Sequence, residues 1–184
     1  MKSNRKGRGI MTKQLKAIQE YCDSQNWNYS VNEEKNYLTM RMSLRSVESC
    51  TIYAQARGED GFTIYTVFPL KAPEGKRDAV AAFLTRANYG LIVGNFELDF
   101  DDGEIRYKVT AINGEDNLLP PDVTERLFDM GFCMFDRYGE GLLSVIYGNA
   151  APIETVDAIE RRDDEQEEED APVAPTALGG TMLS

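Results

Sequence analysis

The sequence predicts an α+β fold, in which helices pack on an antiparallel sheet in the order helix, strands, helix, hairpin, helix. Apolar and polar residues alternate over residues 38–44, which is typical of a strand with one solvent-exposed face. Apolar residues recur at helical spacing over residues 11–22 and 80–87. The dipeptide Asp102-Gly103 lies between two further alternating segments and is typical of a hairpin turn. We therefore expect a sheet that combines an N-terminal meander with a C-terminal hairpin.

The first expected helix has one apolar stripe, made by Met11, Leu15, Ile18 and Cys22. These residues are three or four positions apart, so they fall on one side of a helix. Thr12 stands at the start of this pattern. A threonine hydroxyl can accept a hydrogen bond from an unpaired backbone N–H of the first turn, so Thr12 is the expected N-cap.

The N-terminal meander is expected to contain antiparallel strands joined by polar turns. It opens with Trp27, Tyr29 and Val31, which alternate with polar residues. The segments that follow are a turn at residues 32–36, a strand at 38–44, a strand at 50–56, a turn at 57–61 and a strand at 62–68.

A second helix is expected after the meander, because Val80, Phe83, Leu84 and Ala87 form another stripe at helical spacing. Gly90 follows the last residue of this stripe. Glycine is the residue most often found just beyond the end of a helix, so Gly90 is expected to stop it. The chain then enters the hairpin.

Acidic residues crowd the region of the expected hairpin, namely Glu97, Asp99, Asp101, Asp102 and Glu104. A calcium-binding EF-hand loop needs oxygen ligands at its first and third positions and a Gly at its sixth. With Gly103 at the sixth position, the first and third are Leu98 and Phe100, whose side chains cannot bind a cation. We therefore expect no metal here, and the sequence predicts no cofactor elsewhere.

A two-residue type I′ turn at Asp102-Gly103 fits the same segment better. Counting outward from this turn pairs Asp99 with Arg106 and Glu97 with Lys108. Opposite charges then face each other on one side of the hairpin. The other side is apolar and is expected to lie in the core, with Phe96, Leu98, Phe100, Tyr107 and Val109.

The last expected helix covers residues 123–138 and begins near Pro121. It carries two apolar stripes, one with Val123, Leu127, Met130, Met134 and Tyr138, the other with Phe128, Phe132 and Phe135. One stripe can cover the sheet. The second must be covered either by residues 142–147 of the same chain or by another molecule. The row Phe128, Phe132 and Phe135 is therefore a candidate protein-interaction site.

The chain is expected to divide into three regions. Residues 1–10 form a basic N-terminal extension, which is expected to be disordered. Residues 11–150 form the folded domain. Residues 151–184 form a tail that is first acidic and then rich in Ala, Pro and Gly, and we expect it to be disordered because periodic apolar residues are missing.

The net charge of −11 is unevenly distributed. Residues 1–8 carry +4 and residues 154–170 carry −8, which leaves −7 for the rest of the chain. Because nucleic-acid backbones are bound by clustered Lys and Arg, an acidic domain argues against a nucleic-acid partner. The basic residues of the N-terminal extension are the exception, and they are Lys2, Arg5, Lys6 and Arg8.

The sequence contains no His, which removes the Ser-His-Asp and Cys-His arrangements and most catalytic zinc sites. Cys22, Cys50 and Cys133 are far apart and form no Cys-x-x-Cys motif, so they are expected to be small core residues. No apolar run is as long as a membrane helix, and the N-terminus has no signal-peptide core. We expect a cytoplasmic protein without a membrane partner.

The segment RANYGLIVGNFELDFDDGEIRYKV, residues 86–109, together with LLSVIYG at 142–148, resembles the YbjN family of bacterial sensory transduction regulators. The resemblance extends in element order over residues 11–150. It implies the fold of the type III secretion chaperones and a homodimer, and it supplies no active-site residues. The sequence departs from the family at residues 138–141, Tyr-Gly-Glu-Gly, where the family typically has a Tyr followed by a Pro-Gly-like break.

These observations predict a non-enzymatic protein-binding module, a chaperone-like or regulatory protein in bacterial signalling or stress adaptation. It is expected to bind a segment of a partner protein, still unknown, through an apolar helix or sheet surface. One alternative is a carboxylate-dependent enzyme built on Asp101, Asp102 and Glu104, although carboxylates on an exposed turn stay solvated. The other alternative is a weak nucleic-acid binder that uses the basic N-terminus.

Overall fold

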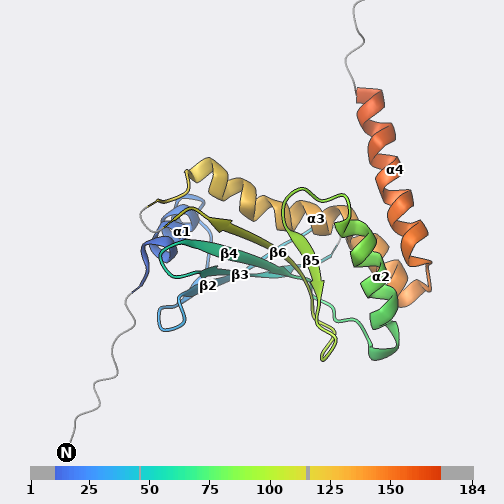
Figure 1. The fold of residues 1–184 in the computed structure, drawn as a ribbon, viewed down its shortest axis with the longest axis horizontal. Helices are drawn as coiled ribbons and strands as arrows, with labels where there is room; N and C mark the ends of the chain where they lie inside the picture. Colours follow the sequence, from blue (N-terminus) through green and yellow to red (C-terminus); the bar gives the residue numbers. More distant parts are fainter. Residues whose placement is uncertain (1–10, 46, 115–116, 171–184) are drawn as a thin grey trace, which may run out of the picture.

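The computed structural model describes residues 11–45, 47–114 and 117–170 (Figure 1). The helices are α1 (Lys13–Ser24), α2 (Arg77–Asn88), α3 (Pro121–Gly148) and α4 (Pro152–Asp170), with a short 3-10 helix η1 (Glu74–Lys76) before α2. The strands are β1 (Ser30–Asn32), β2 (Tyr37–Met42), β3 (Cys50–Ala56), β4 (Gly61–Val67), β5 (Asn95–Leu98) and β6 (Ile105–Ile112). The α+β prediction is confirmed. The basic extension at residues 1–10 lies outside the described residues.

The described strands form one antiparallel sheet in the order β1-β2-β3-β4-β6-β5. Residues alternate along the strands between a buried face and a second face, as in β3, where Ile52 and Ala54 are buried and Tyr53 is exposed. Figure 1 shows α3 running along the sheet, with α1 at one end and α2 and α4 at the other. The aromatic contacts of α1, α2 and the sheet all converge on α3, so these helices share the buried face.

Helix α1 begins as the sequence predicts. The Leu15 backbone N–H donates a hydrogen bond of 3.2 Å to the Thr12 hydroxyl, which is the predicted N-cap. Leu15, Ile18 and Cys22 are buried. In α2 the whole predicted stripe is buried, and that helix ends at Asn88, two residues before Gly90.

The hairpin exists, but the predicted turn and register are wrong. Leu98 pairs with Ile105 and Glu97 with Arg106, so each β5 residue pairs two positions earlier along β6 than predicted. Residues 99–104 form a longer connection, closed by a hydrogen bond of 2.9 Å from the Asp99 N–H to the Glu104 carbonyl. Because the shift is two residues and side chains alternate with a period of two, the buried and exposed faces keep their identities.

The longer connection changes the position of Phe100, which is 54% exposed instead of lying in the core. The predicted type I′ turn needs positive φ at two residues, but only Gly103 of the pair has it, at +81°. A tertiary contact holds the connection, because the Ala72 N–H donates to the Gly103 carbonyl at 2.8 Å. A Cβ at Gly103 would lie 2.1 Å from the Ala72 carbonyl oxygen, so glycine is required there.

Helix α3 is longer than predicted, since it continues through the glycines at 139 and 141 to Gly148. Its 28 residues correspond to about 42 Å of helix. Residues at alternating spacings of four and three are buried along almost its whole length: Thr124, Phe128, Gly131, Phe135, Tyr138, Leu142 and Val145. We call this row the α3 seam. Val123, Leu127, Met130 and Met134, the stripe that could have covered the sheet, lie beside the seam and are only partly buried.

The α3 seam approaches the sheet very closely at Gly131. A Cβ at this residue would lie 1.9 Å from Oγ1 and 2.7 Å from Cβ of Thr66, a buried residue of β4. These distances are far below van der Waals contact, so only glycine fits without a shift of the helix. The rings of Phe128 and Phe135 flank this point and fill the space between helix and sheet.

Helix α4 contradicts the prediction of disorder for residues 152–170. Val156 is fully buried and Ile159 is partly buried, so a short apolar stripe does exist. Two arginines of the domain add ion pairs: Arg86 contacts Asp157 at 2.8 Å and Glu160 at 2.7 Å, and Arg137 contacts Asp163 at 2.5 Å. Residues 171–184, the Ala, Pro and Gly-rich part of the predicted tail, lie outside the described residues.

We expect the substitution Gly131→Ala to lower the free energy of unfolding by about 1–3 kcal/mol, the range typical of an overpacked core. The added methyl group would overlap the Thr66 side chain. Rotation of that side chain does not relieve the overlap, because the methyl would also lie 2.7 Å from the Thr66 Cβ, which is attached directly to the backbone. Chemical denaturation followed by circular dichroism measures the change. Gly148→Ala in the same helix is the control, since its nearest neighbour, the Ser144 Cβ, is 3.9 Å away. An equal effect of both substitutions would contradict the close approach.

Candidate functional site

The three residues of the predicted interaction row, Phe128, Phe132 and Phe135, differ in their exposure to solvent. Phe128 and Phe135 are 0% exposed, and Phe132 is partly buried. Phe128 and Phe135 are covered by other residues of the same chain. They are therefore not accessible to a partner in this conformation, and a role of Phe132 in partner binding stays a prediction.

The rings that cover Phe128 and Phe135 come from distant parts of the chain. Phe128 stacks on Tyr21 at 5.5 Å between ring centroids and meets Trp27 edge-on at 5.6 Å. Phe135 lies 5.0 Å from Phe68 and 5.5 Å from Phe96 by the same measure. Aromatic contacts of this kind add stability beyond the burial of area, so these two residues are structural.

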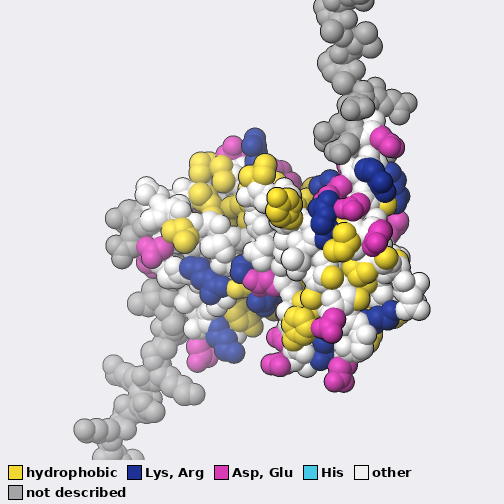
Figure 2. All heavy atoms as spheres, turned by 45° about the vertical axis from the view of Figure 1, so that its right-hand side comes forward, with side chains coloured by type: hydrophobic (Ala, Val, Ile, Leu, Met, Phe, Trp, Pro, Cys, Tyr) yellow, Lys and Arg dark blue, Asp and Glu magenta, His cyan; other side chains and the backbone are white. Residues whose placement is uncertain are grey.

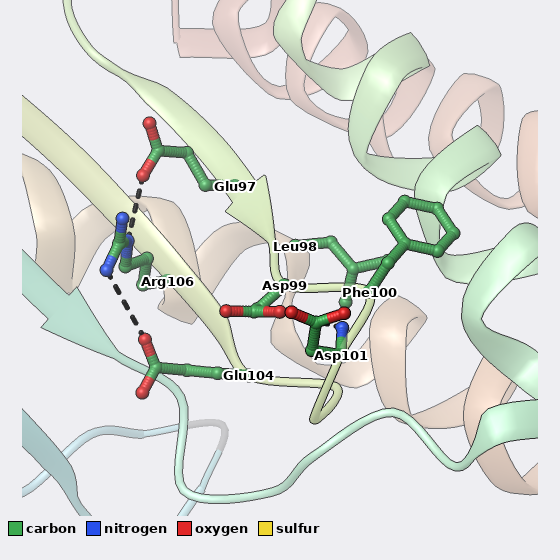
Figure 3. Close-up of a pocket in the computed structure, with 7 residues that line it drawn as sticks. All are labelled: Glu97, Leu98, Asp99, Phe100, Asp101, Glu104 and Arg106. Carbon is green, nitrogen blue, oxygen red and sulfur yellow. Dashed lines mark hydrogen bonds and ion pairs between the residues drawn. The ribbon is translucent and has the colours of Figure 1, made fainter.

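The acidic hairpin surrounds an open hollow of about 590 Å³. Figure 3 shows Arg106 between two carboxylates, with Glu97 at 2.8 Å and Glu104 at 3.5 Å. Glu97 also pairs with Lys108. The ring of Phe100 points away from these charged groups, toward the helices (Figure 3). Two cations thus compensate the most sheltered carboxylate of the hairpin.

The hairpin carboxylates with perturbed acidity are stabilised in their ionised forms. Burial alone would raise the pKa of Glu97, but the hydrogen bonds from Lys108 and Arg106 outweigh it and the pKa lies below the ordinary value. At Asp102 the hydrogen bond from Lys71 lowers the pKa as well. A general acid at neutral pH needs the opposite shift, so these two groups are poor candidates for that role. No cluster suited to a metal ion occurs within the described parts of the chain.

The cysteines are only partly as predicted. Cys22 and Cys50 are buried, and burial raises the pKa of their thiols to about 12 and about 11. Cys133 is exposed on α3, which corrects its assignment to the core. Its pKa is also raised, by partial burial and by the nearby Asp129 and Asp136. All three thiols are therefore protonated at neutral pH and are weak nucleophiles.

A surface that the sequence analysis missed is the connection between α2 and β5, residues 89–94, which we call the apolar loop. Tyr89 is 90% exposed, Ile92 is 98% exposed and Val93 is 40% exposed. Leu91 is the residue of the loop that packs on the core. Large apolar side chains presented together to solvent are typical of interaction sites. The sequence signal was a short apolar run between Gly90 and Gly94, outside any helical or strand periodicity.

The apolar loop is held at both ends by hydrogen bonds. The Asn88 side chain accepts from the Phe96 N–H at 2.7 Å and donates to the Phe96 carbonyl at 3.0 Å, which ties the end of α2 to β5. The Tyr107 hydroxyl donates to the Val93 carbonyl. Gly94 has a positive φ of +73°, and a Cβ there would lie 2.5 Å from the Tyr107 hydroxyl oxygen. The ends of the loop are therefore fixed, although the side chains of Tyr89 and Ile92 face solvent.

None of the helices in the described ranges is long and apolar enough to cross a membrane.

Comparison with known proteins gives one family. The profile of the YbjN family, described as "Putative bacterial sensory transduction regulator", matches residues 14–144. The match includes all of α1 but its first residue, the whole sheet, the apolar loop and most of α3, and it ends before α4. No curated protein matches the chain.

We expect Glu97→Gln to lower the free energy of unfolding at pH 7 by about 0.5–1 kcal/mol, because the ion pairs with Arg106 and Lys108 are partly exposed. The pKa of Glu97 is lower in the folded state than its ordinary value of 4.5. The stability that the Glu97 carboxylate contributes is therefore present above pH 4.5 and is lost as the pH falls through the folded-state pKa. Denaturation curves of the wild type and of the variant, recorded from pH 7 to pH 3, measure the free energy of unfolding. The difference between wild type and variant should shrink over this acidic range.

Asp101→Asn is the control for this titration, since Asp101 makes no ion pair with the residues that the structure describes. Its stability should follow that of the wild type. A Glu97→Gln variant whose deficit stays constant down to pH 3 would contradict the assigned role of the carboxylate.

Proposed function

The chain belongs to the YbjN family, and on this premise we propose that it is a non-enzymatic, protein-binding regulator in bacterial signalling or stress adaptation. The family is described as a regulator and not as an enzyme. In this proposal the protein works in a chaperone-like manner, by binding a segment of a partner protein through exposed apolar side chains. The partner segment contacts the apolar loop at residues 89–94.

The observation that carries the proposal is the combination of exposure and rigidity in the apolar loop. Ile92 is 98% exposed and Tyr89 is 90% exposed, so neither contributes appreciably to the core of the chain. Burying a large apolar side chain in a partner contributes about 1.5–3 kcal/mol. The hydrogen bonds from Asn88 and Tyr107 hold the loop in place before binding. Little conformational entropy is then lost in the complex.

The position of the apolar loop also supports a role in binding. It directly precedes β5, an edge strand of the sheet, and the Val93 carbonyl is bonded to Tyr107 of the neighbouring strand. Tyr107 packs against Phe96, which in turn contacts Phe135 of the α3 seam. The loop is therefore connected to the core through consecutive ring contacts, and a partner bound to it is held against a rigid body.

We expect Ile92→Asp to weaken binding to an isolated partner by about tenfold or more, since it replaces an apolar contact with a charge that must be desolvated. Partners are first captured from a bacterial lysate on the immobilised wild-type chain and identified by mass spectrometry. The affinity of each purified partner is then measured by calorimetry for wild type and variants.

Ile112→Asp is the matched control, because Ile112 is also highly exposed, at 79%, but lies at the far end of β6. It should change the affinity by less than about twofold, as expected for a residue outside the interface. Equal losses for the two variants, or no loss for Ile92→Asp, would refute the apolar loop as the binding element. Both variants are expected to fold, since both residues are outside the core.

A further inference from the structure

One face of the sheet has no helix on it in the part of the chain that the structure describes. Thr66 of β4 faces Gly131 of α3, so Tyr65, the residue before it, points to the opposite side of the sheet. Its cross-strand neighbours share that side, which we call the open sheet face. The residues of the open sheet face are Tyr37, Thr39 and Arg41 of β2, Thr51, Tyr53 and Gln55 of β3, Thr63, Tyr65 and Val67 of β4, and Arg106, Lys108 and Thr110 of β6.

Aromatic rings occupy the middle of the open sheet face. Tyr53 and Tyr65 are cross-strand neighbours on β3 and β4, the two central strands of the sheet. Tyr53 is 39% exposed, and its ring meets that of Tyr37 edge-on at 6.1 Å between centroids. An exposed ring on a flat surface can stack on a nucleobase, since every base has a flat aromatic face.

Basic side chains surround these rings. The central carbon of the Arg106 guanidinium lies 4.5 Å from the centre of the Tyr65 ring. Glu97 and Glu104 compensate Arg106, and Glu97 also pairs with Lys108. Figure 2 shows Lys and Arg side chains gathered left of centre at the height of the strands. The open sheet face is therefore basic, although the chain has a net charge of −11.

Two arginines carry a charge that no described carboxylate compensates. Arg57, just after β3, is held by neutral groups, since its Nε donates to the Thr63 hydroxyl at 2.9 Å and its Nη2 donates to the Tyr65 hydroxyl. Arg41 donates from Nη2 to the Ser49 hydroxyl at 2.8 Å. Neither forms an ion pair with a residue that the structure describes. Guanidinium groups of this kind bind phosphate or carboxylate oxygens through paired N–H donors.

The spacing of the two arginines sets the length of a ligand that contacts both. Arg41 is paired with Thr51 at the start of β3, and Arg57 comes six residues after Thr51, which is about 20 Å of extended chain. At about 3.4 Å per nucleotide of a stacked strand, this corresponds to about six nucleotides, within the range of known single-strand sites. Tyr53 lies between the two arginines along the chain, and an open hollow of about 290 Å³ adjoins Arg41.

The middle of a sheet is better suited to a nucleic acid than to an acidic peptide. The backbone groups of β2, β3 and β4 are paired with the neighbouring strands. A peptide that lies across them loses water from its own backbone groups and finds few backbone partners there, whereas an added strand needs a sheet edge. A single-stranded nucleic acid has no such requirement, because it binds through phosphate charges and stacked bases.

We propose that the open sheet face binds single-stranded nucleic acid, with a base stacked on Tyr53 and phosphates on Arg41 and Arg57. The net charge argued against such a partner, but a net charge sums over the whole surface. Charges more than about 8 Å away are largely screened at physiological salt, so the basic residues of the face dominate there. Helix α4, with its many acidic residues, lies at the other end of the molecule from β2 (Figure 1). The surface is separate from the apolar loop, so this site does not depend on the proposed function.

Fluorescence anisotropy on the full-length chain tests the proposal. The probes are fluorescein-labelled oligouridylate and oligothymidylate of about twelve nucleotides, which distinguish RNA from DNA. We expect the wild type to bind at least one of them with a dissociation constant below about 100 µM at low salt, as in sequence-independent binding. A DNA duplex of the same length should bind at least about tenfold more weakly, because its bases are not free to stack on Tyr53.

The stacking contact is tested by Tyr53→Thr, which removes the ring and keeps a residue suited to a strand. It should weaken binding of the single strand by about tenfold. Tyr89→Thr is the matched control, because Tyr89 is an exposed ring on the apolar loop. It should change the affinity by less than about twofold. Circular dichroism shows whether each variant is folded.

The phosphate contacts are tested by combining Arg41→Gln with Arg57→Gln. The slope of log affinity against log salt should fall in magnitude by about 1.4, since each phosphate contact on a single strand contributes about 0.7. Lys16→Gln with Arg126→Gln, on α1 and α3, changes the net charge equally and should leave the slope as in the wild type.

The basic N-terminal extension needs its own control, the variant with Lys2→Gln, Arg5→Gln, Lys6→Gln and Arg8→Gln. Binding should persist in this variant and should still depend on Tyr53. Complete loss of binding in it would assign the nucleic acid to the extension and overturn the proposal. The proposal is also overturned if the wild type binds neither oligonucleotide, if Tyr53→Thr binds as tightly as the wild type, or if oligoglutamate of the same length binds as tightly as the oligonucleotides.

Discussion

The close approach of α3 to the sheet at Gly131 is the constraint on which the rest of the structure depends. With no side chain at this point, the helix backbone lies directly over Thr66, and the rings of Phe128 and Phe135 fill the wider spaces on either side. Those rings then receive the residues of α1 and β5 that pack on them. Tyr138, further along the α3 seam, does the same for α2 through Phe83. One glycine thereby sets the distance at which α3 packs on the sheet, and α1 and α2 pack on the rings beside it.

The parts of the fold that the sequence predicted are those encoded by local periodicity. The stripe of α2 and the Thr12 cap of α1 need only nearby residues to be recognised. The hairpin register could not be predicted, because a contact between Ala72 and Gly103, far apart in the sequence, selects the longer connection. Helix α4 was missed for the same reason, since its acidic residues are stabilised by Arg86 and Arg137 of other helices. Composition alone made that segment look unable to fold.

The candidate binding site could not be predicted from the sequence, for a different reason. Sequence reasoning placed partner binding on the row with Phe128 and Phe135, because surplus apolar residues on a helix suggest a missing cover. The cover came from Trp27 and Phe68, which no periodicity connects with α3. The most exposed large apolar residues, Tyr89 and Ile92, are in a loop, where periodicity makes no prediction about burial. Whether an apolar residue is exposed thus depends on the other elements that surround it.

The attachment of α4 differs in kind from the rest of the packing. Val156 and Ile159 supply apolar contacts, and the polar contacts include the ion pairs with Arg86 and Arg137 and a hydrogen bond of 3.2 Å from the Tyr138 hydroxyl to Glu160. Such an element opens at a smaller free-energy cost than a helix seated on aromatic rings. Its backbone amides therefore exchange with solvent deuterium ahead of those in α3, and rising ionic strength widens the gap. A change in the salt concentration around the protein is therefore expected to act on the attachment of α4 before it acts on the packing of α3.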